Sequence, residues 1–239
     1  MENSTYVALS GQFARERQMA VLANNIANLS TAGFKSERLG FKEYLSGSDP
    51  ENQTSYVATS GNTRDMSQGP LTHTGNPLDV ALDGAGFIAV TTAAGAAYTR
   101  NGHLQINAQS QLVNTNGDVV QGDGGAPIVI PQGATDITIG TDGSIATRQG
   151  KIAKLPVVNF DKPQALVASS NGLYNTDQTP VPVTTTRVMQ GTIEESNVSP
   201  VLEMTRLMEA SHEMGTAKTF ADGEHTRLKN AIDRLGKTI

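Results

Sequence analysis

The spacing of apolar residues changes twice along this chain of 239 residues, and the two changes limit what it can fold into. Near the N-terminus, apolar residues recur three and four positions apart, which places them on one face of an α-helix. From about residue 69 to 190 they alternate with polar residues between frequent turn signals, as in short β-strands. Helical spacing returns after Pro200. The sequence therefore predicts an α+β protein with long terminal helices and a central all-β domain.

The N-terminal helix is predicted over residues 4–29. Gly33 is expected to end it, because a glycine just past a helix readily adopts the left-handed conformation. Less regular apolar residues from Phe34 to Leu45 suggest a packed extension of uncertain structure, and the Ser-, Asn- and Thr-rich segment that follows suggests a linker. The expected organisation is helix and extension at 1–45, linker or exposed loop at 46–68, β domain at 69–190 and C-terminal helix at 191–239.

The central region contains several turn signals. Tight turns between strands are predicted at Asn101-Gly102, Asn116-Gly117 and Asp142-Gly143. Evenly spaced short strands of this kind suggest a sandwich or a barrel-like domain. Three further glycines are interpreted as structural turn residues rather than ligand contacts: Gly33, Gly84 and Gly86.

The C-terminal helix carries an apolar seam of alternating three- and four-residue steps. Its predicted pairs are Met204/Leu207, Ser211/Met214, Lys218/Ala221, His225/Leu228 and Ile232/Leu235. Because three of these positions are polar, the seam is weak on its own, and a lone helix of such composition is marginal in water. Each terminal helix, about 40 Å and 50 Å long at 1.5 Å per residue, is therefore expected to need a partner.

Composition argues against several classes of function. The net charge of -5 comes without a cluster of Lys or Arg, so a nucleic-acid surface is not expected. The absence of cysteine excludes disulfides, thiolate zinc sites and thiol catalysis. No run of residues is long and apolar enough to span a membrane, and the N-terminus lacks the apolar segment of a cleavable signal peptide.

No catalytic, cofactor or metal site is predicted. The Gly-x-Gly-x-x-Ala match at residues 84–89 leads into a β-branched segment instead of the helix that dinucleotide binding requires. The four histidines lack metal-ligand spacing. Five glutamates are interpreted as solvated residues or as charge partners between helices: Glu194, Glu195, Glu203, Glu209 and Glu213. An enzyme is therefore not expected.

Four motifs resemble, in order, the signatures of bacterial flagellar rod and hook proteins. They are ANNIANLSTAGFK at 23–35, TGNPLDVALDGAGF at 74–87, YTRNGHL at 98–104 and QGTIEESNV at 190–198. The resemblance spans nearly the whole chain and is weakest at 46–68 and 176–188. Within this family, the length and the single compact β insert are most similar to a proximal-rod subunit, and the longer distal-rod subunit is the alternative.

The resemblance implies a structural subunit of the flagellar basal-body rod. Proteins of this family pair their N- and C-terminal helices into an inner tube, with the β domain outside. The implied partners are further copies, other rod subunits and the flagellar export apparatus, and the implied location is the periplasmic rod, reached without a cleavable signal. No nucleic acid, small-molecule substrate or cofactor is implied. A β-domain binding module dimerised by its helices is the alternative from another functional class.

Three asparagines in one turn suggest how such subunits could be aligned. Asparagine is a mediocre helix former, yet Asn24, Asn25 and Asn28 end the N-terminal helix. A buried amide in an interchain seam needs a partner that only one register supplies, so we expect these three to specify the stagger between subunits. Alternatively, Asn28 caps its own helix and the other two face solvent. The predicted assembly interface comprises Leu22, Asn24, Asn25, Ile26, Asn28, Leu29, Asn197, Met204, Leu207, Met214, Leu228, Ile232 and Leu235.

Overall fold

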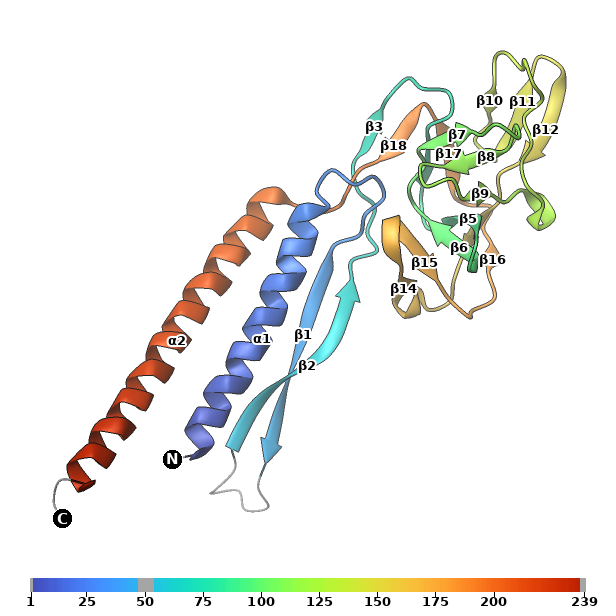
Figure 1. Ribbon diagram of the computed structural model, residues 1–239. Coiled ribbons are helices and arrows are strands. Elements are labelled where there is room, and N and C mark those ends of the chain that lie inside the picture. The colour runs from blue at the N-terminus through green and yellow to red at the C-terminus, as the bar shows by residue number, and fades with distance from the viewer. Residues whose placement is uncertain (1, 47–53, 237–239) are drawn as a thin grey trace. The chain divides into compact units, whose positions relative to one another are not determined.

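The computed structural model describes residues 2–46 and 54–236, which form two compact units (Figure 1). The first, here called the helical unit, is built from residues 2–27, 37–46, 54–64 and 199–236. The second, the β unit, is built from residues 28–36 and 65–198. Each unit therefore combines segments that lie far apart in the sequence.

Helix α1 runs from Glu2 to Ala27, close to the predicted 4–29. It ends six residues before Gly33, so the prediction that this glycine stops the helix is wrong. A turn follows α1 instead, in which the backbone N–H of Thr31 donates to the carbonyl of Asn28 at 3.2 Å. Gly33 lies in the chain beyond that turn, with a φ of +70°.

A long β-hairpin stands where an extension and a linker were expected. Strand β1 (Glu37–Ser46) pairs antiparallel with β2 (Thr54–Arg64), with a register shift between Gly40 and Phe41. Strand β2 lies within the expected linker at 46–68, of which residues 47–53 lie outside the described part of the chain. Neither strand has a fully buried side chain among its described residues, and its apolar residues do not alternate regularly with polar ones, so the sequence lacks the pattern that marks a half-buried strand. Its Thr, Tyr and Val residues nonetheless favour extended backbone.

Helix α2 runs from Pro200 to Gly236 and contains 37 residues. It begins at a proline, whose fixed φ suits the first turn of a helix. The preceding segment, expected to belong to the C-terminal helix from residue 191, instead contains strand β18 (Thr192–Glu194). Glu203 lies in the first turn, where a carboxylate interacts favourably with the helix dipole.

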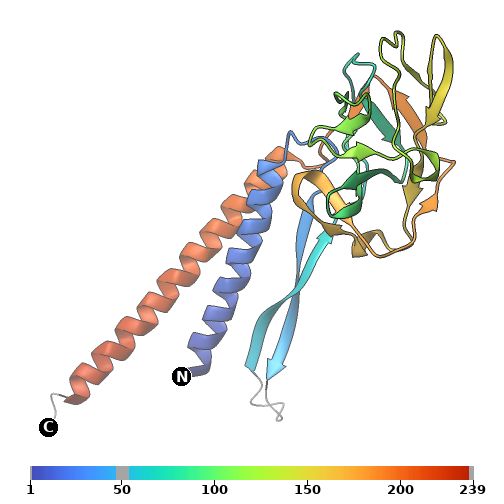
Figure 2. The same ribbon diagram turned by 45° about the vertical axis from the view of Figure 1, so that its right-hand side comes forward.

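Within the helical unit, α1 lies between α2 and the hairpin in both views (Figures 1 and 2). The two helices run antiparallel and contact each other along α1, and α1 also contacts both hairpin strands. None of the helices in the described part of the chain is both long and apolar enough to cross a membrane.

The β unit contains short strands joined into antiparallel sheets. Its remaining strands are β3 (Leu71–His73), β4 (Val80–Asp83), β5 (Phe87–Thr92), β6 (Gly95–Thr99), β7 (Leu104–Ile106), β8 (Leu112–Asn114), β9 (Val119–Val120), β10 (Thr138–Ile139), β11 (Ser144–Thr147), β12 (Gly150–Lys154), β13 (Val157–Asn159), β14 (Val167–Ala168), β15 (Leu173–Asn175), β16 (Val181–Pro182) and β17 (Arg187–Gln190). The largest sheet has the order β14-β15-β6-β5-β9-β8-β7, with β13 joining β5 to β16. Smaller sheets are β10-β11-β12, β17-β4 and β18-β3.

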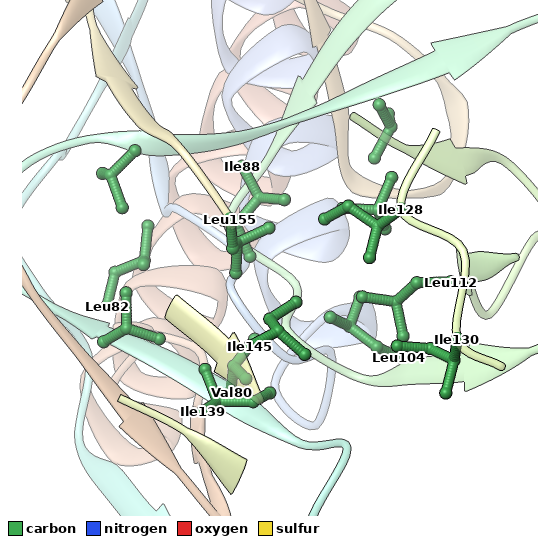
Figure 3. Packing of buried hydrophobic residues seen from close by; sticks show 14 of the residues in the cluster. Val80, Leu82, Ile88, Leu104, Leu112, Ile128, Ile130, Ile139, Ile145 and Leu155 are labelled. Atoms are coloured by element: carbon green, nitrogen blue, oxygen red, sulfur yellow. The ribbon is translucent and has the colours of Figure 1, made fainter. Parts of the chain in front are cut away.

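The core of the β unit consists of aliphatic residues from many of these strands (Figure 3). Val80, Ile88, Leu104 and Ile145 are among its fully buried members. A second cluster contains aromatic rings, with Tyr98 and Phe160 in an edge-on arrangement at a centroid distance of 4.7 Å. The α+β class with a β-rich central region is therefore confirmed.

Two of the three predicted tight turns connect paired strands. Gly117, with φ of +89°, lies between β8 and β9, and Gly143, with φ of +79°, lies between β10 and β11. Asn101-Gly102 lies between β6 and β7, which do not pair with each other. A Cβ on Gly102 would lie 1.6 Å from the carbonyl oxygen of Val80, so the glycine is needed there for close backbone approach.

Candidate assembly surface

Asn25 is the most deeply buried residue of the predicted interface, at 1% exposure. Its amide nitrogen donates to the backbone carbonyl of Glu37 at 2.9 Å and to the Glu203 carboxylate at 3.0 Å. Its amide oxygen accepts from the Glu37 N–H at 2.9 Å. These three bonds tie α1 to β1 and α2 of the same chain. A role for Asn25 in setting the stagger between chains stays a prediction.

The other two asparagines have different surroundings. Asn24 is exposed on α1. Asn28 directly follows the helix and is half-buried, and its amide oxygen accepts from the Thr31 hydroxyl at 3.0 Å. This bond fits the alternative in which Asn28 closes the end of its own helix. A role for Asn24 and Asn28 in setting the stagger between chains stays a prediction.

Two contacts define how α1 and α2 are aligned. Asn25 contacts Glu203, and the guanidinium of Arg15 pairs with Glu213 at 2.9 Å. Arg15 precedes Asn25 by ten residues on α1, and its partner Glu213 follows Glu203 by ten residues on α2. Both contacts therefore report one antiparallel register, and Glu203 and Glu213 are charge or hydrogen-bond partners between helices, as the sequence analysis allowed.

The seam between the helices differs by one residue from the predicted one. Apart from Arg206, which pairs with Glu203, the α2 side chains described as shielded at least in part recur four and three residues apart: Glu203, Leu207, Ala210, Met214, Ala217 and Ala221. In the register above, they lie opposite Asn25, Val21, Gln18, Ala14, Gly11 and Val7. The prediction included Leu207, Met214 and Ala221. In place of Glu203, Ala210 and Ala217 it named the residue that follows each of them. Met204, Ser211, Lys218 and His225 are exposed. Small residues allow the helices to approach closely, which a search for large apolar residues does not detect.

The remaining predicted interface residues are divided between the inside and the outside of the helical unit. Leu22 is buried, and Ile26 is half-buried. Met204 and Ile232 are exposed by 50% and 68%. The side chains of Leu228 and Leu235 lie outside the described part of the structure, and Leu29, which is half-buried, belongs to the β unit.

The helical unit presents many large apolar side chains to solvent. They come from all of its elements: Tyr6, Leu9 and Phe13 on α1, Phe41, Tyr44, Leu45 and Val57 on the hairpin, and Val201, Leu202, Met204, Met208, Phe220 and Ile232 on α2. Extended exposed apolar surfaces of this kind mark sites of protein association. This surface is the candidate functional site of the chain.

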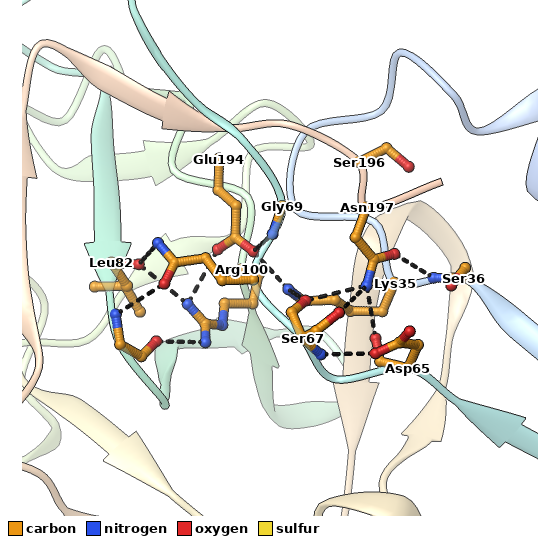
Figure 4. Close-up of polar contacts among 12 residues, drawn as sticks. Lys35, Ser36, Asp65, Ser67, Gly69, Leu82, Arg100, Glu194, Ser196 and Asn197 are labelled. Atoms are coloured by element: carbon orange, nitrogen blue, oxygen red, sulfur yellow. Dashed lines mark hydrogen bonds and ion pairs between the residues drawn. The ribbon is translucent and has the colours of Figure 1, made fainter. Parts of the chain in front are cut away.

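A buried charge cluster in the β unit was missed by sequence reasoning (Figure 4). The Glu194 carboxylate accepts from the Lys35 ammonium at 2.5 Å, from the Arg100 guanidinium at 3.0 Å and from the Gly69 N–H at 3.1 Å. All three charged side chains are at most 4% exposed. Glu194 was expected to be solvated or to pair between helices, and the structure corrects this. The sequence offered one signal for this pair, because Lys35 lies in the motif at 23–35 and Glu194 in the motif at 190–198.

The cluster holds two cations and one carboxylate. Backbone carbonyls complete it, because Lys35 also donates to Ser67 at 2.7 Å and Arg100 to Gly84 at 2.7 Å. Burial lowers the pKa of Lys35, and its contact with Glu194 opposes this shift. Burial likewise lowers the pKa of Arg100, again opposed by Glu194. Glu194 thus favours the charged form of both buried cations, and the Asp65 carboxylate adds to its effect on Lys35.

Asn197 acts beside this cluster within the β unit. Its amide nitrogen donates to the carbonyls of Asp65 at 2.8 Å and Ser67 at 3.0 Å, and its amide oxygen accepts from the Ser36 N–H at 2.8 Å. These bonds join three segments that are distant in the sequence. Asn197 thus has a role within its own chain, and its place in the assembly interface stays a prediction.

The three predicted turn glycines all have positive φ, at +70° for Gly33, +122° for Gly84 and +136° for Gly86. Two of them also lie against neighbouring atoms. A Cβ on Gly33 would lie 2.5 Å from the backbone of Arg100, and one on Gly86 would lie 2.5 Å from the Val157 side chain. Within the described residues, no group of three or more His, Cys, Asp or Glu side chains could hold a metal ion.

Comparison with known proteins identifies the family. Three family models match segments of the chain: "Flagella basal body rod protein" at 6–35, "Flagellar hook protein FlgE/F/G D1 domain" at 81–147 and "Flagellar basal body rod FlgEFG protein C-terminal" at 189–213. Together they cover α1, part of the β unit and the start of α2.

Curated relatives extend this match over almost the entire chain. The flagellar basal-body rod protein FlgF of Caulobacter vibrioides is 35% identical over 99% of both chains, and FlgF of Mesorhizobium japonicum is 36% identical over 99% of both. FlgG of Caulobacter vibrioides is 32% identical over 85% of this chain and 88% of its own. The match to FlgF is thus more complete than the match to FlgG. The chain belongs to the flagellar basal-body rod protein family, which is a family of structural proteins rather than enzymes.

Proposed function

We propose that this chain polymerises through its paired terminal helices as a subunit of the proximal rod, within the shaft that crosses the periplasm. The observation that carries this proposal is the helical unit, in which α1 and α2 pair in one register while large apolar side chains remain exposed. If the two helices and the hairpin needed no further partner, most of these large apolar side chains would be buried within the unit. The exposed set therefore points to further protein in contact with these helices.

The near-complete match to FlgF favours a proximal-rod subunit over a distal one. Further copies of the chain and other rod subunits are the expected partners. The flagellar export apparatus is the expected route out of the cytoplasm. A contact between two different surfaces of identical chains yields an open helical filament when its rotation does not close, which suits a shaft.

A deletion strain tests this function. Cells that lack the gene are expected to be non-motile and to lack complete rods, and the intact chain supplied in trans should restore both. The measurements are spreading in soft agar and electron microscopy of purified basal bodies. Normal rods and normal swimming in the deletion strain would refute the proposed function.

The second candidate is a binding module that uses its helices only to dimerise. The same exposed apolar residues would be compatible with it, since a dimer also covers surface. Light scattering separates the two, because a helical dimer stops at two chains at every concentration. A rod subunit stays monomeric or grows beyond two.

A further inference from the structure

Helix α2 extends beyond the helix on which it packs. In the register set by the Asn25–Glu203 and Arg15–Glu213 contacts, Glu2 lies opposite Thr226. The last ten residues of α2, Arg227–Gly236, therefore continue past the first described residue of α1 by about 15 Å at 1.5 Å per residue. Ile232 lies in this overhang and is 68% exposed. Apolar residues in the overhang recur four and three positions apart, at Leu228, Ile232 and Leu235.

A second apolar stripe lies on α1, away from its seam with α2. Its members are Tyr6, Leu9 and Phe13, which are exposed by 59%, 43% and 58%. Beside it, an open groove of about 550 Å³ separates α1 from strand β2. The groove is lined by Ser10, Phe13, Ala14 and Arg17 from α1 and by Val57, Ala58 and Thr59 from β2. The Arg17 guanidinium donates to the Thr59 hydroxyl at 2.8 Å, so one part of the groove is polar. The stripe and the apolar part of the groove, at Phe13, Ala14 and Val57, together form a surface for another helix.

The two apolar stripes match each other in spacing. Read toward the N-terminus, the overhang positions Leu235, Ile232 and Leu228 are separated by three and then four residues. Read toward the C-terminus, Tyr6, Leu9 and Phe13 are separated by the same intervals. In an antiparallel pairing, all three positions of one stripe can therefore face those of the other: Tyr6 with Leu235, Leu9 with Ile232 and Phe13 with Leu228. We propose that the overhang of α2 in one copy packs against Tyr6, Leu9 and Phe13 and into the α1–β2 groove of a second copy.

This pairing implies a defined stagger between copies. Within one chain Leu9 lies opposite Thr219, whereas in the pairing it lies opposite Ile232 of the other copy. The difference of thirteen residues is an axial shift of about 20 Å. Both copies can point the same way along the assembly, because α1 and α2 run antiparallel in the proposed contact just as they do within one chain. The contact joins two different surfaces, so each copy can use both, and the assembly can grow.

The inference rests on the proposed function, because it specifies which surfaces the assembling chains would use. Engineered cysteines test it directly, since the natural chain has none. Basal bodies would be isolated from cells whose only copy carries Leu9→Cys and Ile232→Cys. A disulfide requires Cα atoms within about 7 Å, so these cysteines, about 20 Å out of register in one chain, cannot join within it. Mild oxidation should give a ladder of dimers, trimers and longer species on non-reducing gels.

The matched control is Leu9→Cys with Met208→Cys. Met208 is 66% exposed, nearly the same as Ile232, but lies outside the overhang. It should give no ladder. No ladder from the Leu9/Ile232 pair, an equal ladder from the control, or a crosslink only to a different protein would each overturn the pairing. Swimming of the same cells shows separately whether the chain still serves the rod, so the pairing can fail while the proposed function stands.

A charge swap provides the second test and does not depend on disulfide geometry. Leu9→Lys and Ile232→Glu should each reduce swimming at least several-fold, because each places a charge in an apolar contact. The two together should restore much of it, because the proposed pairing sets them opposite each other. A double variant no better than the single ones would contradict the pairing.

Discussion

Replacing Glu194 with glutamine is expected to lower the unfolding free energy of the β unit by about 3–5 kcal/mol. The Glu194 carboxylate bonds to both Lys35 and Arg100, and its side chain is fully buried. Without it, two cations would remain in a site of low polarity with only neutral acceptors. An uncompensated buried charge is among the most costly single changes a folded protein can carry.

Urea denaturation of the purified chain measures this effect, and Glu195→Gln is the matched control. Glu195 is the next residue, is exposed and accepts a hydrogen bond from the Thr72 hydroxyl at 2.7 Å. Its replacement should change the unfolding free energy by less than about 1 kcal/mol. Lys35→Met should cost less than Glu194→Gln, since it leaves the Arg100–Glu194 pair balanced. Equal, small effects of both Glu variants would show that the buried cluster contributes little.

Replacing Asn25 with leucine is the second change expected to have a large effect. It removes three hydrogen bonds and leaves the Glu203 carboxylate and both backbone groups of Glu37 without this partner. Each buried polar group left unsatisfied costs about 1–3 kcal/mol, so a loss near 3 kcal/mol is expected for the helical unit. The exposed neighbour offers a control, because Asn24→Leu should leave the stability of the isolated chain almost unchanged.

Thermal melting followed by far-UV circular dichroism reports this loss, since both long helices belong to the helical unit. The Asn25 variant should lose helical signal at a lower temperature, while the near-UV signal of the aromatic cluster in the β unit melts as in the natural chain. A helical transition at the natural temperature would mean that the Asn25 amide does not hold α1, α2 and β1 together.

Periodicity predicted the elements of this chain better than it predicted their contacts. The N-terminal helix was located to within a few residues, and the C-terminal helix was found although its start was placed too early, because apolar residues recur at helical intervals over many turns. The hairpin formed by β1 and β2 was missed, since its strands have no buried face to produce an apolar pattern. Local sequence therefore identified the long elements and overlooked the exposed hairpin.

The polar partners could not be derived from sequence in the same way. Asn25 was correctly selected as a buried amide, but its partner Glu203 lies 178 positions away in the same chain. Lys35 and Glu194 are separated by 159 positions and form a pair only because the fold brings them together. The type of a residue indicates that it needs a partner when buried, whereas the fold determines which residue supplies it.

The central claim is that the helix pair carries the assembly of the rod, and Ala210→Asp tests it most directly. Ala210 is 2% exposed and lies in the α2 seam against α1, so a carboxylate there should separate the helices without altering the β unit. The measurement is swimming of cells whose only copy carries this change, with electron microscopy of their basal bodies. The account predicts an intact β unit, incomplete rods and no swimming. Complete rods and normal swimming, in a chain whose helical signal in circular dichroism melts at a lower temperature than in the natural chain, would contradict it.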